Sequence, residues 1–415
     1  MYETEQKKER VILVGISLSD AEDVDQSLDE LEELARTAGA ECVGRVIQKR
    51  ELIHPGTYVG KGKLDEIRDL LWETEADGII CDDELSPAKI GNLKDELHTK
   101  IMDRTLLILD IFAARASTNE GKIQVELAQL KYRQSRLTGY GTSLSRLGGG
   151  IGTRGPGEKK LEMDRRLIKG RIARLNRELT EVKNHRQVAR EQRKKEMLPV
   201  IAIVGYTNAG KSTLLNYLTG AEVLAENKLF ATLDPTTRGY QLGSGQKVLF
   251  TDTVGFIRKL PHHLIDAFRS TLEEAKYADL ILHVVDASNP QLDEQMHIVY
   301  ETLRGLGVQD KPVITVFNKQ DLLTEPVILR DFQADATVPI SAATGAGIDA
   351  LESKLEEVLR GQKALVEYTF PYKDAAKIQL IRKYGELLRE EYLEDGIAVE
   401  AYVPIPIYGK IFADS

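Results

Sequence analysis

Hydrophobic and polar residues alternate with two different spacings over the first 116 residues. Buried strands are predicted for four short apolar runs: 11–18, 42–47, 78–83 and 105–112. Residues 21–39 and 63–76, which lie between these runs, repeat apolar positions with the period of a helix. Strands that alternate with amphipathic helices are typical of a parallel sheet with crossover helices. We therefore expect an N-terminal α/β domain over residues 1–116.

Helical spacing dominates residues 117–197. In the segment 120–137 the repeating apolar residues are Ile123, Leu127, Leu130 and Leu137. In the segment 158–197 they are Leu161, Ile168, Ile172, Leu175, Leu179 and Val182. The stretch 137–160 has eight glycines in its first 21 positions, which disfavours any packed element. We predict an antiparallel helical hairpin with a glycine-rich tip, whose second helix, of about 35 residues, would span roughly 50 Å.

Two further parts follow the hairpin. A new apolar run begins at Val200 and leads into a domain that we place at residues 198–362. The last part, residues 363–415, is predicted to be a small α/β domain with a strand, a helix and a strand: 366–370, 373–393 and 397–405. We expect its two strands to pair across the helix. No chemistry is apparent in this last part, so a packing or docking role is the default.

The distribution of charge changes this picture more than the composition does. The net charge is −9, yet residues 117–197 contain 20 Lys and Arg against 9 Asp and Glu, a balance of +11 that leaves −20 for the rest. A basic block inside an acidic chain favours a polyanionic partner, and a solvated helix face is the alternative. The charged start, the lack of long apolar runs and only two cysteines indicate a cytoplasmic protein without membrane spans or disulfides.

The strongest chemical signal is a phosphate-binding motif between a strand and a helix. It has the pattern G-x-x-x-x-G-K-S and consists of Gly205, Tyr206, Thr207, Asn208, Ala209, Gly210, Lys211 and Ser212. Glycines allow backbone amides to wrap phosphates. Lys211 supplies a cation to the β- and γ-phosphate oxygens, and Ser212 offers a hydroxyl to Mg²⁺. We expect Lys211 and Ser212 to be catalytic.

Three more motifs follow in the order that a guanine-nucleotide domain requires. The first is the run of Asp252, Thr253, Val254 and Gly255, in which the Gly255 amide faces the γ-phosphate. The second is the run of Asn318, Lys319, Gln320 and Asp321, whose terminal carboxylate can accept from two guanine donors that adenine lacks. In the third, the backbone amides of Ser341, Ala342 and Ala343 can reach guanine O6. The four motifs predict a GTPase on a doubly wound, mostly parallel sheet.

Two questions about the catalytic machinery stay open at this level. The threonine that binds Mg²⁺ must lie between Ser212 and Asp252, where Thr232, Thr236 and Thr237 are all available. Phe256 follows Gly255, at the position where Ras-like proteins carry a water-orienting glutamine, so we expect slow intrinsic hydrolysis.

Two loops also have alternative interpretations. Asn208 could help to hold K⁺ near the phosphates, or it could only shape its loop. The turn at residues 60–63, "GKGK", could bind an anion at a helix start, or it could only cap that helix.

The motifs "GYTNAGKSTL", "FATLDPTTR", "DTVGFI", "NKQD" and "SAATG", preceded by "GTRGPGEKKLE", resemble those of the HflX family of translational GTPases. The resemblance covers residues 10–362. It implies that Thr232 is the catalytic Mg²⁺-binding threonine, beside Ser212, with Asp252 in the outer coordination shell. It also implies nucleotide contacts from the switch residues around Thr232, which are Phe230, Ala231, Leu233 and Asp234.

The same resemblance implies partners. Family members bind the large ribosomal subunit, and some split stalled ribosomes; their N-terminal domain is reported to bind ATP. The hairpin here would then follow rRNA, with its tip in the peptidyl-transferase region. The expected RNA contacts are Arg146, Arg154, Lys159, Lys160, Arg166 and Arg174. We expect a cytoplasmic monomer whose hydrolysis the ribosome stimulates. The alternatives are a GTP-regulated protein-binding switch and an assembly factor without splitting activity.

Overall fold

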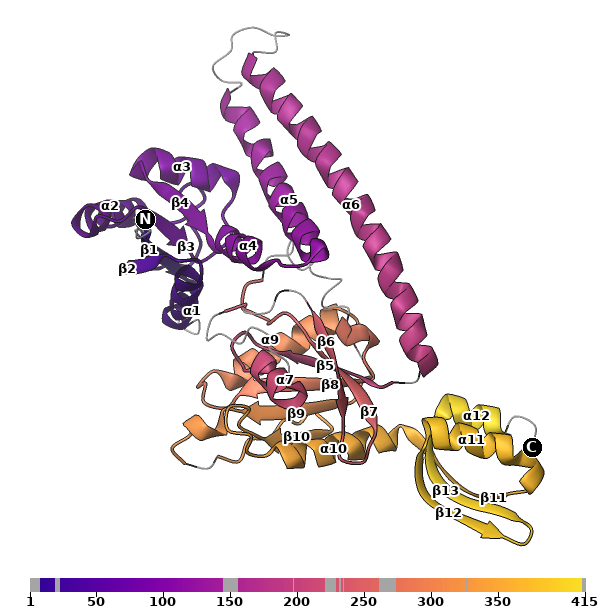
Figure 1. Cartoon of the computed structure of the whole chain (residues 1–415). Helices are drawn as coiled ribbons and strands as arrows, with labels where there is room; N and C mark the ends of the chain where they lie inside the picture. Colours follow the sequence, from indigo (N-terminus) through magenta and orange to yellow (C-terminus); the bar gives the residue numbers. More distant parts are fainter. Residues whose placement is uncertain are drawn as a thin grey trace, which may run out of the picture. The chain divides into compact units, whose positions relative to one another are not determined.

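The computed structural model describes most of the chain (Figure 1). The described residues are 8–18, 23–144, 156–196, 198–220, 229–230, 233, 235–260, 274–308, 310–325 and 327–412. The chain forms two compact units. The first comprises Met1–Gln187, Leu224–Asp234 and Val254–Leu272, and the second comprises Val188–Val223, Pro235–Thr253 and Glu273–Ser415.

The first unit contains a four-stranded parallel sheet with the strand order β2-β1-β3-β4. Its strands are β1 (Arg10–Ser17), β2 (Glu41–Lys49), β3 (Gly78–Cys81) and β4 (Lys100–Asp103). Its helices are α1 (Val24–Thr37), α2 (Lys61–Thr74), α3 (Pro87–Leu97) and α4 (Arg104–Arg115). Apolar residues of α2 and α3 pack on one face of the sheet, around Ile12 and Val14. The predicted α/β architecture is confirmed.

The prediction of a strand at residues 105–112 is wrong, because this apolar run forms α4. The strand that precedes it, β4, ends at Asp103, whose Oδ1 accepts a hydrogen bond from the Leu106 amide at 2.9 Å and caps the helix. A buried helix and a buried strand are both apolar around most of their surface. The spacing of a short apolar run therefore does not separate them.

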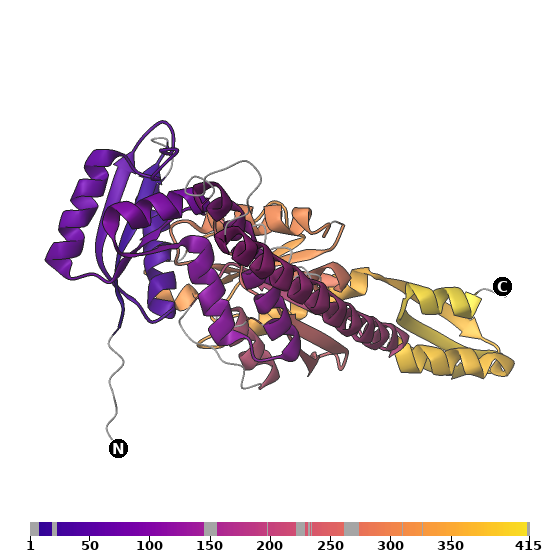
Figure 2. The same ribbon diagram turned by 90° about the horizontal axis from the view of Figure 1, so that it is seen from above.

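The basic segment forms two long helices, α5 (Asn119–Leu144) and α6 (Pro156–Glu196), which run side by side (Figures 1 and 2). Their shared core consists of Ile123, Leu127, Leu130, Ile172, Leu175 and Leu179, as the apolar spacing predicts. Helix is also present within 137–160, where we expected none: α5 continues to Leu144 and α6 begins at Pro156. Proline suits a first helical turn, and a formed helix extends through isolated glycines at modest cost.

The second unit contains a six-stranded sheet with the order β10-β9-β8-β5-β7-β6, in which only β6 is antiparallel. Its strands are β5 (Val200–Gly205), β6 (Thr236–Gln241), β7 (Lys247–Asp252), β8 (Leu280–Asp286), β9 (Val313–Asn318) and β10 (Ala336–Pro339). Its helices are α7 (Lys211–Thr219), α9 (Leu292–Gly305) and α10 (Ile348–Gly361), with a short 3₁₀ helix η1 (Gln320–Leu322).

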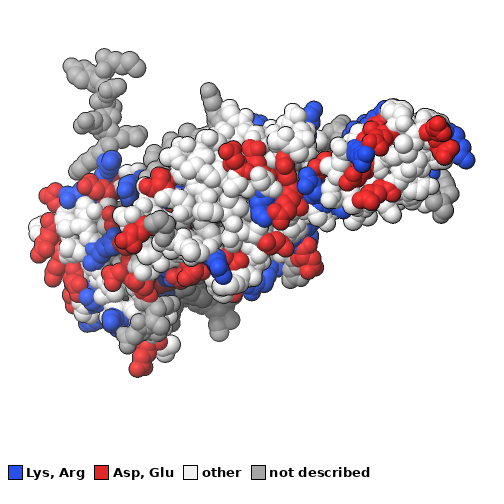
Figure 3. All heavy atoms as spheres, turned by 90° about the horizontal axis from the view of Figure 1, so that it is seen from below, with Lys and Arg blue, Asp and Glu red and all other residues white. Residues whose placement is uncertain are grey.

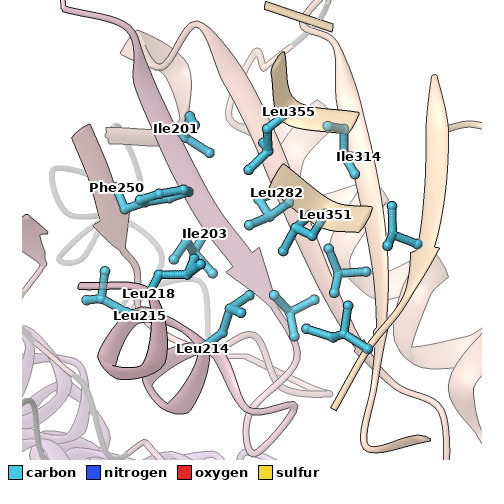
Figure 4. Packing of buried hydrophobic residues seen from close by; sticks show 14 of the residues in the cluster. Ile201, Ile203, Leu214, Leu215, Leu218, Phe250, Leu282, Ile314, Leu351 and Leu355 are labelled. Atoms are coloured by element: carbon cyan, nitrogen blue, oxygen red, sulfur yellow. The ribbon is translucent and has the colours of Figure 1, made fainter. Parts of the chain in front are cut away.

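Helices cover both faces of this sheet. Apolar side chains of α7 and α10, including Leu214 and Leu355, pack on one face (Figure 4), whereas Met296 and Tyr300 of α9 pack on the other. This is the doubly wound, mostly parallel arrangement that the motifs predict. Among the described residues, no helix is long and apolar enough to cross a membrane.

The C-terminal part of the second unit is a three-stranded antiparallel sheet with the order β11-β13-β12. Its elements are β11 (Lys363–Phe370), a 3₁₀ helix η2 (Tyr372–Asp374), α11 (Ala375–Tyr384), β12 (Glu386–Leu393), β13 (Gly396–Pro404) and α12 (Ile405–Phe412). The predicted pairing of the outer two segments is confirmed by the β11–β13 ladder. The predicted helix over 373–393 is wrong beyond Tyr384, because its second half forms β12. The dipeptide Asp395–Gly396 at the β12–β13 turn is a hairpin signal that the helical pattern concealed.

Candidate nucleotide-binding site

The phosphate-binding loop joins the end of β5 to the start of α7. At Gly210 the backbone φ is +96°, and a Cβ atom there would lie 2.2 Å from Asn318 Nδ2. At Gly205 a Cβ atom would lie 2.2 Å from the carbonyl oxygen of Val284. Both positions therefore require glycine. The loop delivers its amides to the N-terminus of α7, where the helix dipole favours negative charge.

Lys211 begins α7 and is buried. Its Nζ donates to the carbonyl oxygen of Tyr206 at 2.8 Å, which holds the side chain against the loop. Burial lowers the pKa of Lys211 to about 8, against an opposing effect of Asp252. The hydroxyl of Thr207 is also buried and has no hydrogen-bond partner within the part of the chain that the structure describes. A cation and a free donor in one loop suit a phosphate group.

Ser212 and Asp252 form the second part of the site. The Ser212 hydroxyl donates to Asp252 Oδ2 at 2.8 Å, and Asp252 is buried at the end of β7. Thr253 Oγ1 donates to the carbonyl oxygen of Ile203 at 2.8 Å and fixes the backbone beside it. The hydroxyl is a hard oxygen ligand that fits Mg²⁺, and the carboxylate that accepts its hydrogen bond fits the outer coordination shell. Mg²⁺ would neutralise phosphate charge at this position.

Asn318 connects three of the sequence motifs. Its Nδ2 donates to the carbonyl oxygen of Ala209 at 2.9 Å, and its Oδ1 accepts from the Ala342 amide at 2.9 Å. The next residue, Lys319, has a left-handed backbone with φ of +63°, and its Nζ donates to Asp286 Oδ2 at 2.6 Å. The buried Asn318 side chain thus holds the phosphate loop and the 341–343 loop at a fixed separation.

The base-recognition residues lie at the carboxyl ends of β9 and β10. Asp321 is exposed in η1, while Gln320 is anchored by Nε2 to the carbonyl oxygen of Phe317 at 3.1 Å. The Ser341 amide donates to the carbonyl oxygen of Ala346 at 2.9 Å, and the Ala342 amide already donates to Asn318. The contact of the Ser341, Ala342 and Ala343 amides with guanine O6 stays a prediction.

The structure decides little about the first switch. Ala231, Thr232 and Asp234 lie outside the described residues, so the assignment of Thr232 to Mg²⁺ stays a prediction. Thr237, one of the alternatives, lies within β6, and its Oγ1 is 2.9 Å from the Thr251 Oγ1. Thr236 also lies in β6, opposite Asp252 in the ladder. Both alternatives thus lie within a paired strand, and the choice among the three threonines stays a prediction.

Both nucleotide switch segments include residues that pack within the first unit. Phe230 and Leu233 are buried there, and the ring of Phe230 meets the edge of Phe112 with centroids 4.6 Å apart. Gly255 belongs to the segment after β7, and Phe256 beside it is buried, so its side chain cannot orient a water molecule. The predicted slow hydrolysis is consistent with this position.

Sequence reasoning missed an ion cluster in the second of these segments. Lys259 Nζ donates to Asp82 Oδ2 at 2.6 Å and to Asp83 Oδ1 at 2.8 Å. Asp82 also accepts from the Ser27 hydroxyl and from Arg104. The two acidic residues after β3 can be seen in the sequence as "CDD". No sequence pattern, however, predicts that they contact a lysine about 176 residues further along the chain.

The turn at residues 60–63 acts as a helix cap. The Gly60 amide donates to Gln48 Oε1 at 2.8 Å, and the Lys63 ammonium lies 2.7 Å from Glu66 Oε2. These contacts within the protein favour the capping alternative over an anion site.

Nucleotide binding above pH 8 is expected to take up a proton at Lys211. The pKa of this side chain is lowered to about 8 by burial, so it is mostly neutral at pH 9. Phosphate oxygens in contact with it raise the pKa, and affinity should fall by about tenfold per pH unit above that value. Calorimetric titration at pH 9 in two buffers of different ionisation enthalpy measures the uptake. Lys211→Arg, which stays charged, should abolish it, and buffer-independent heats for the wild type would contradict the assignment.

Comparison with known proteins finds relatives along nearly the whole chain. Three family models match it: "GTP-binding GTPase N-terminal" at residues 25–113, "GTP-binding GTPase Middle Region" at 115–193 and "50S ribosome-binding GTPase" at 200–319. The chain is 66% identical over 411 residues to GTPase HflX of Lacrimispora saccharolytica. This alignment covers 99% of this chain and 97% of that protein. It is 51% identical to GTPase HflX of Caldanaerobacter subterraneus, over 99% of this chain and 95% of that protein.

A solved structure titled as a complex of SsGBP with GDP aligns at 27% identity and a TM-score of 0.48, covering 84% of this chain and 98% of that one. The full-length identity to the curated relatives agrees with the order and the geometry of the four nucleotide motifs. The chain therefore belongs to the HflX family of GTPases and is an enzyme that binds and hydrolyses GTP.

Proposed function

We propose that this GTPase associates with the large ribosomal subunit and acts on translation, by splitting or rescuing ribosomes under stress. The observation that carries the proposal is the basic hairpin of α5 and α6, with a balance of +11 over residues 117–197. The matching family model, "50S ribosome-binding GTPase", agrees with it. An RNA-rich particle is a polyanion of the kind that such an arm suits.

The basic residues of the hairpin divide into two groups. Arg171 pairs with Glu126 of α5 at 2.7 Å, and Arg186 pairs with Glu120 at 2.8 Å, so these two hold the helices together. Other basic side chains of α6 are exposed along its length: Arg166, Lys169, Arg174 and Arg177. The second group is available to phosphates, although Arg174 also contacts Glu178 on the same helix.

Four of the predicted RNA contacts lie near the tip of the hairpin. Arg146 and Arg154 lie outside the described residues. Lys159 and Lys160 lie in the first turns of α6, but their side chains are outside the described part. We propose that this end of the arm reaches the peptidyl-transferase region and that Arg166 and Arg174 bind the flanking rRNA.

Reversing charge on the arm should weaken binding to the large subunit and flatten its salt dependence. Arg166→Glu with Arg174→Glu removes two exposed cations, which should lower the slope of log affinity against log salt by about 2 and affinity by at least about tenfold. Sedimentation with purified large subunits at several salt concentrations measures both. The matched control, Arg36→Glu with Arg304→Glu, makes the same change in net charge at exposed residues of α1 and α9 and should bind like the wild type.

Deleting residues 146–157 should give the opposite profile. Affinity should fall only moderately, because most of the charge lies on the helices, whereas splitting of ribosomes should be lost. If the deletion costs as much affinity as the charge reversal, the tip is the anchor and this division of roles is wrong.

Hydrolysis should be slow in the free protein and faster with the large subunit. Phe256 leaves the attacking water without a side-chain partner, and ordering of the switch segments on the subunit would supply the missing geometry. The test is multiple-turnover phosphate release with large subunits, small subunits or neither. Equal rates in all three conditions would remove ribosome activation from the proposal.

The alternatives predict different results in the same preparations. A GTP-regulated switch that binds only proteins would show a shallow salt dependence. An assembly factor would bind free large subunits without dissociating whole ribosomes. Sedimentation with separated subunits and with whole ribosomes, with a GTP analogue, with GDP or without nucleotide, separates these cases.

The proposal also includes a monovalent cation. Asn208, whose φ is +59°, would help to hold K⁺ near the phosphates. A comparison of hydrolysis rates in potassium and sodium salts tests this role. The N-terminal α/β domain would bind ATP, as the family resemblance implies. We also propose four domains, at residues 1–116, 117–197, 198–362 and 363–415, a monomeric state and a cytoplasmic location that includes ribosomes.

A further inference from the structure

Lys319 has a backbone conformation that residues other than glycine rarely adopt. Its φ is +63° and its ψ is +33°, in the left-handed region. In this region the Cβ atom lies too close to the following carbonyl oxygen, so the conformation persists only where other contacts hold it. Lys319 follows directly after β9 and caps η1, which carries Asp321, the residue expected to bind guanine. The contacts that hold Lys319 therefore bear on recognition of the base.

Asp286, the last residue of β8, supplies one of these contacts. Lys319 Nζ donates to Asp286 Oδ2 at 2.6 Å. The two residues come from neighbouring strands, because Asp286 lies opposite Asn318 in the β8–β9 ladder. The next amide along the chain, that of Ala287, donates to the Asn318 carbonyl oxygen at 2.9 Å. An ion pair and a main-chain hydrogen bond thus join the end of β8 to the turn that follows β9.

The carboxylate of Asp286 is itself held in place. Its Oδ1 accepts a hydrogen bond from the Ser288 amide at 3.0 Å and another from the Ser288 hydroxyl at 2.6 Å. Many acidic side chains of this protein lie at the surface, where Figure 3 shows them in groups over one face. The side chain of Asp286, by contrast, is only 13% exposed. A charge-assisted hydrogen bond that is shielded from water is stronger than an ion pair at the surface.

The backbone of Lys319 determines where the Asp321 carboxylate lies. The carbonyl oxygen of Lys319 accepts from the Leu322 amide at 3.0 Å and closes the turn of η1. The Gln320 amide donates to the carbonyl oxygen of Ile340 at 3.1 Å, which fixes the turn just after β10. Asp321 is exposed between these two hydrogen bonds, so its position follows from the turn that Lys319 begins.

We infer that Asp286 is a positioning residue for guanine recognition and that it acts through Lys319. The ion pair stabilises the left-handed backbone of Lys319, and this backbone orients η1 so that the Asp321 carboxylate meets the two guanine donors. The effect of Asp286 is confined to the base, because the phosphates meet a different loop, residues 205–212. Asp286 has this role only if Asp321 binds guanine, which a separate exchange, Asp321→Asn, tests.

Asp286→Asn removes the charge of the acceptor and keeps the shape of the side chain. The amide oxygen can still accept from Ser288, so the loop after β8 should stay folded, which the thermal midpoint checks. Affinity for GTP should fall by about tenfold, because a charge-assisted hydrogen bond is lost. Affinity for inorganic triphosphate, which has no base, should be unchanged. Competition against a fluorescent guanine nucleotide measures both affinities.

Further variants locate the effect. Ser288→Ala removes one hydrogen bond to the carboxylate but leaves the ion pair, so it should lower GTP affinity by about twofold to threefold and leave triphosphate binding unchanged. In the Asp321→Asn background, Asp286→Asn should cause no further loss of GTP affinity, because the carboxylate that it helps to position is gone. Asp293→Asn, at an exposed carboxylate of α9, is the matched control and should bind both ligands like the wild type.

Four outcomes would overturn the role of Asp286. The first is a wild-type affinity for GTP in Asp286→Asn. The second is an equal loss of affinity for GTP and for inorganic triphosphate, which would mean that Asp286 supports the whole site. The third is a full additional loss in the Asp321→Asn background, which would mean that Asp286 acts independently of Asp321. If Asp286→Asn does not fold, Ser288→Ala decides, and an unchanged affinity for GTP in that variant is the fourth.

Discussion

Lys211→Ala is expected to lower the rate of GTP hydrolysis by about 10²–10³-fold and to weaken GTP binding. Lys211 is the buried cation at the start of α7, held beside the phosphate loop by the Tyr206 carbonyl. Removing it leaves the charge that develops on the phosphates without its direct counter-charge. Single-turnover phosphate release and competition against a fluorescent guanine nucleotide measure the two effects.

Loss of folding would also explain a lower rate of hydrolysis. The structure predicts that replacing Lys211 does not destabilise the protein. Burial lowers the pKa of Lys211, which means that its charged form is disfavoured in the folded protein without nucleotide. The thermal midpoint of the free protein should therefore be unchanged or higher in Lys211→Met, which keeps the apolar stem. A variant that folds and hydrolyses GTP at the wild-type rate would contradict the assignment of this loop.

Asp321→Asn is expected to lower affinity for GTP by about a hundredfold or more and to raise affinity for xanthosine triphosphate. The carboxylate accepts hydrogen bonds from two guanine donors, and charge-assisted bonds of this kind contribute more than neutral ones. An amide cannot accept both, but it can donate to the additional carbonyl of xanthine. Competition binding with the guanine, xanthine and adenine triphosphates gives the change in selectivity.

The geometry makes Asp321 a clean position for this test. Its side chain is exposed in η1, and the backbone around it is fixed by Asn318, Lys319 and Gln320, so the substitution leaves the fold intact. Asp293→Asn, an exposed carboxylate in the first turn of α9, is the matched control and should keep the wild-type preference. Unchanged discrimination between GTP and ATP in Asp321→Asn would overturn the interpretation of "NKQD".

The order and spacing of the nucleotide motifs were readable without a structure because their chemistry is local. The phosphate loop, Asp252, the 318–321 run and the 341–343 run each begin at or just after the end of a strand. Parallel strands bring their carboxyl ends to one edge of a sheet, so linear order was enough to predict a shared site. The same holds for the hairpin, whose apolar spacing defines a seam that Leu127 and Leu175 form.

Segments whose apolar spacing fits both a helix and a strand could not be assigned from the sequence. Residues 105–112 form a helix because Asp103 caps it, and 386–393 form a strand because they pair with β13. A local cap thus decides the first segment, whereas pairing with another strand outweighs local propensity in the second.

The sequence by itself determined the enzyme class, the nucleotide chemistry and the presence of a basic arm, because short motifs and periodic patterns encode them. Only the tertiary structure decided which polar atoms meet. Asn318 joins Ala209 to Ala342, and Lys259 meets Asp82 and Asp83. Glu367 lies opposite Glu400 in the β11–β13 ladder. These contacts depend on strand order and register, which bring residues together at separations that no pattern along the chain specifies.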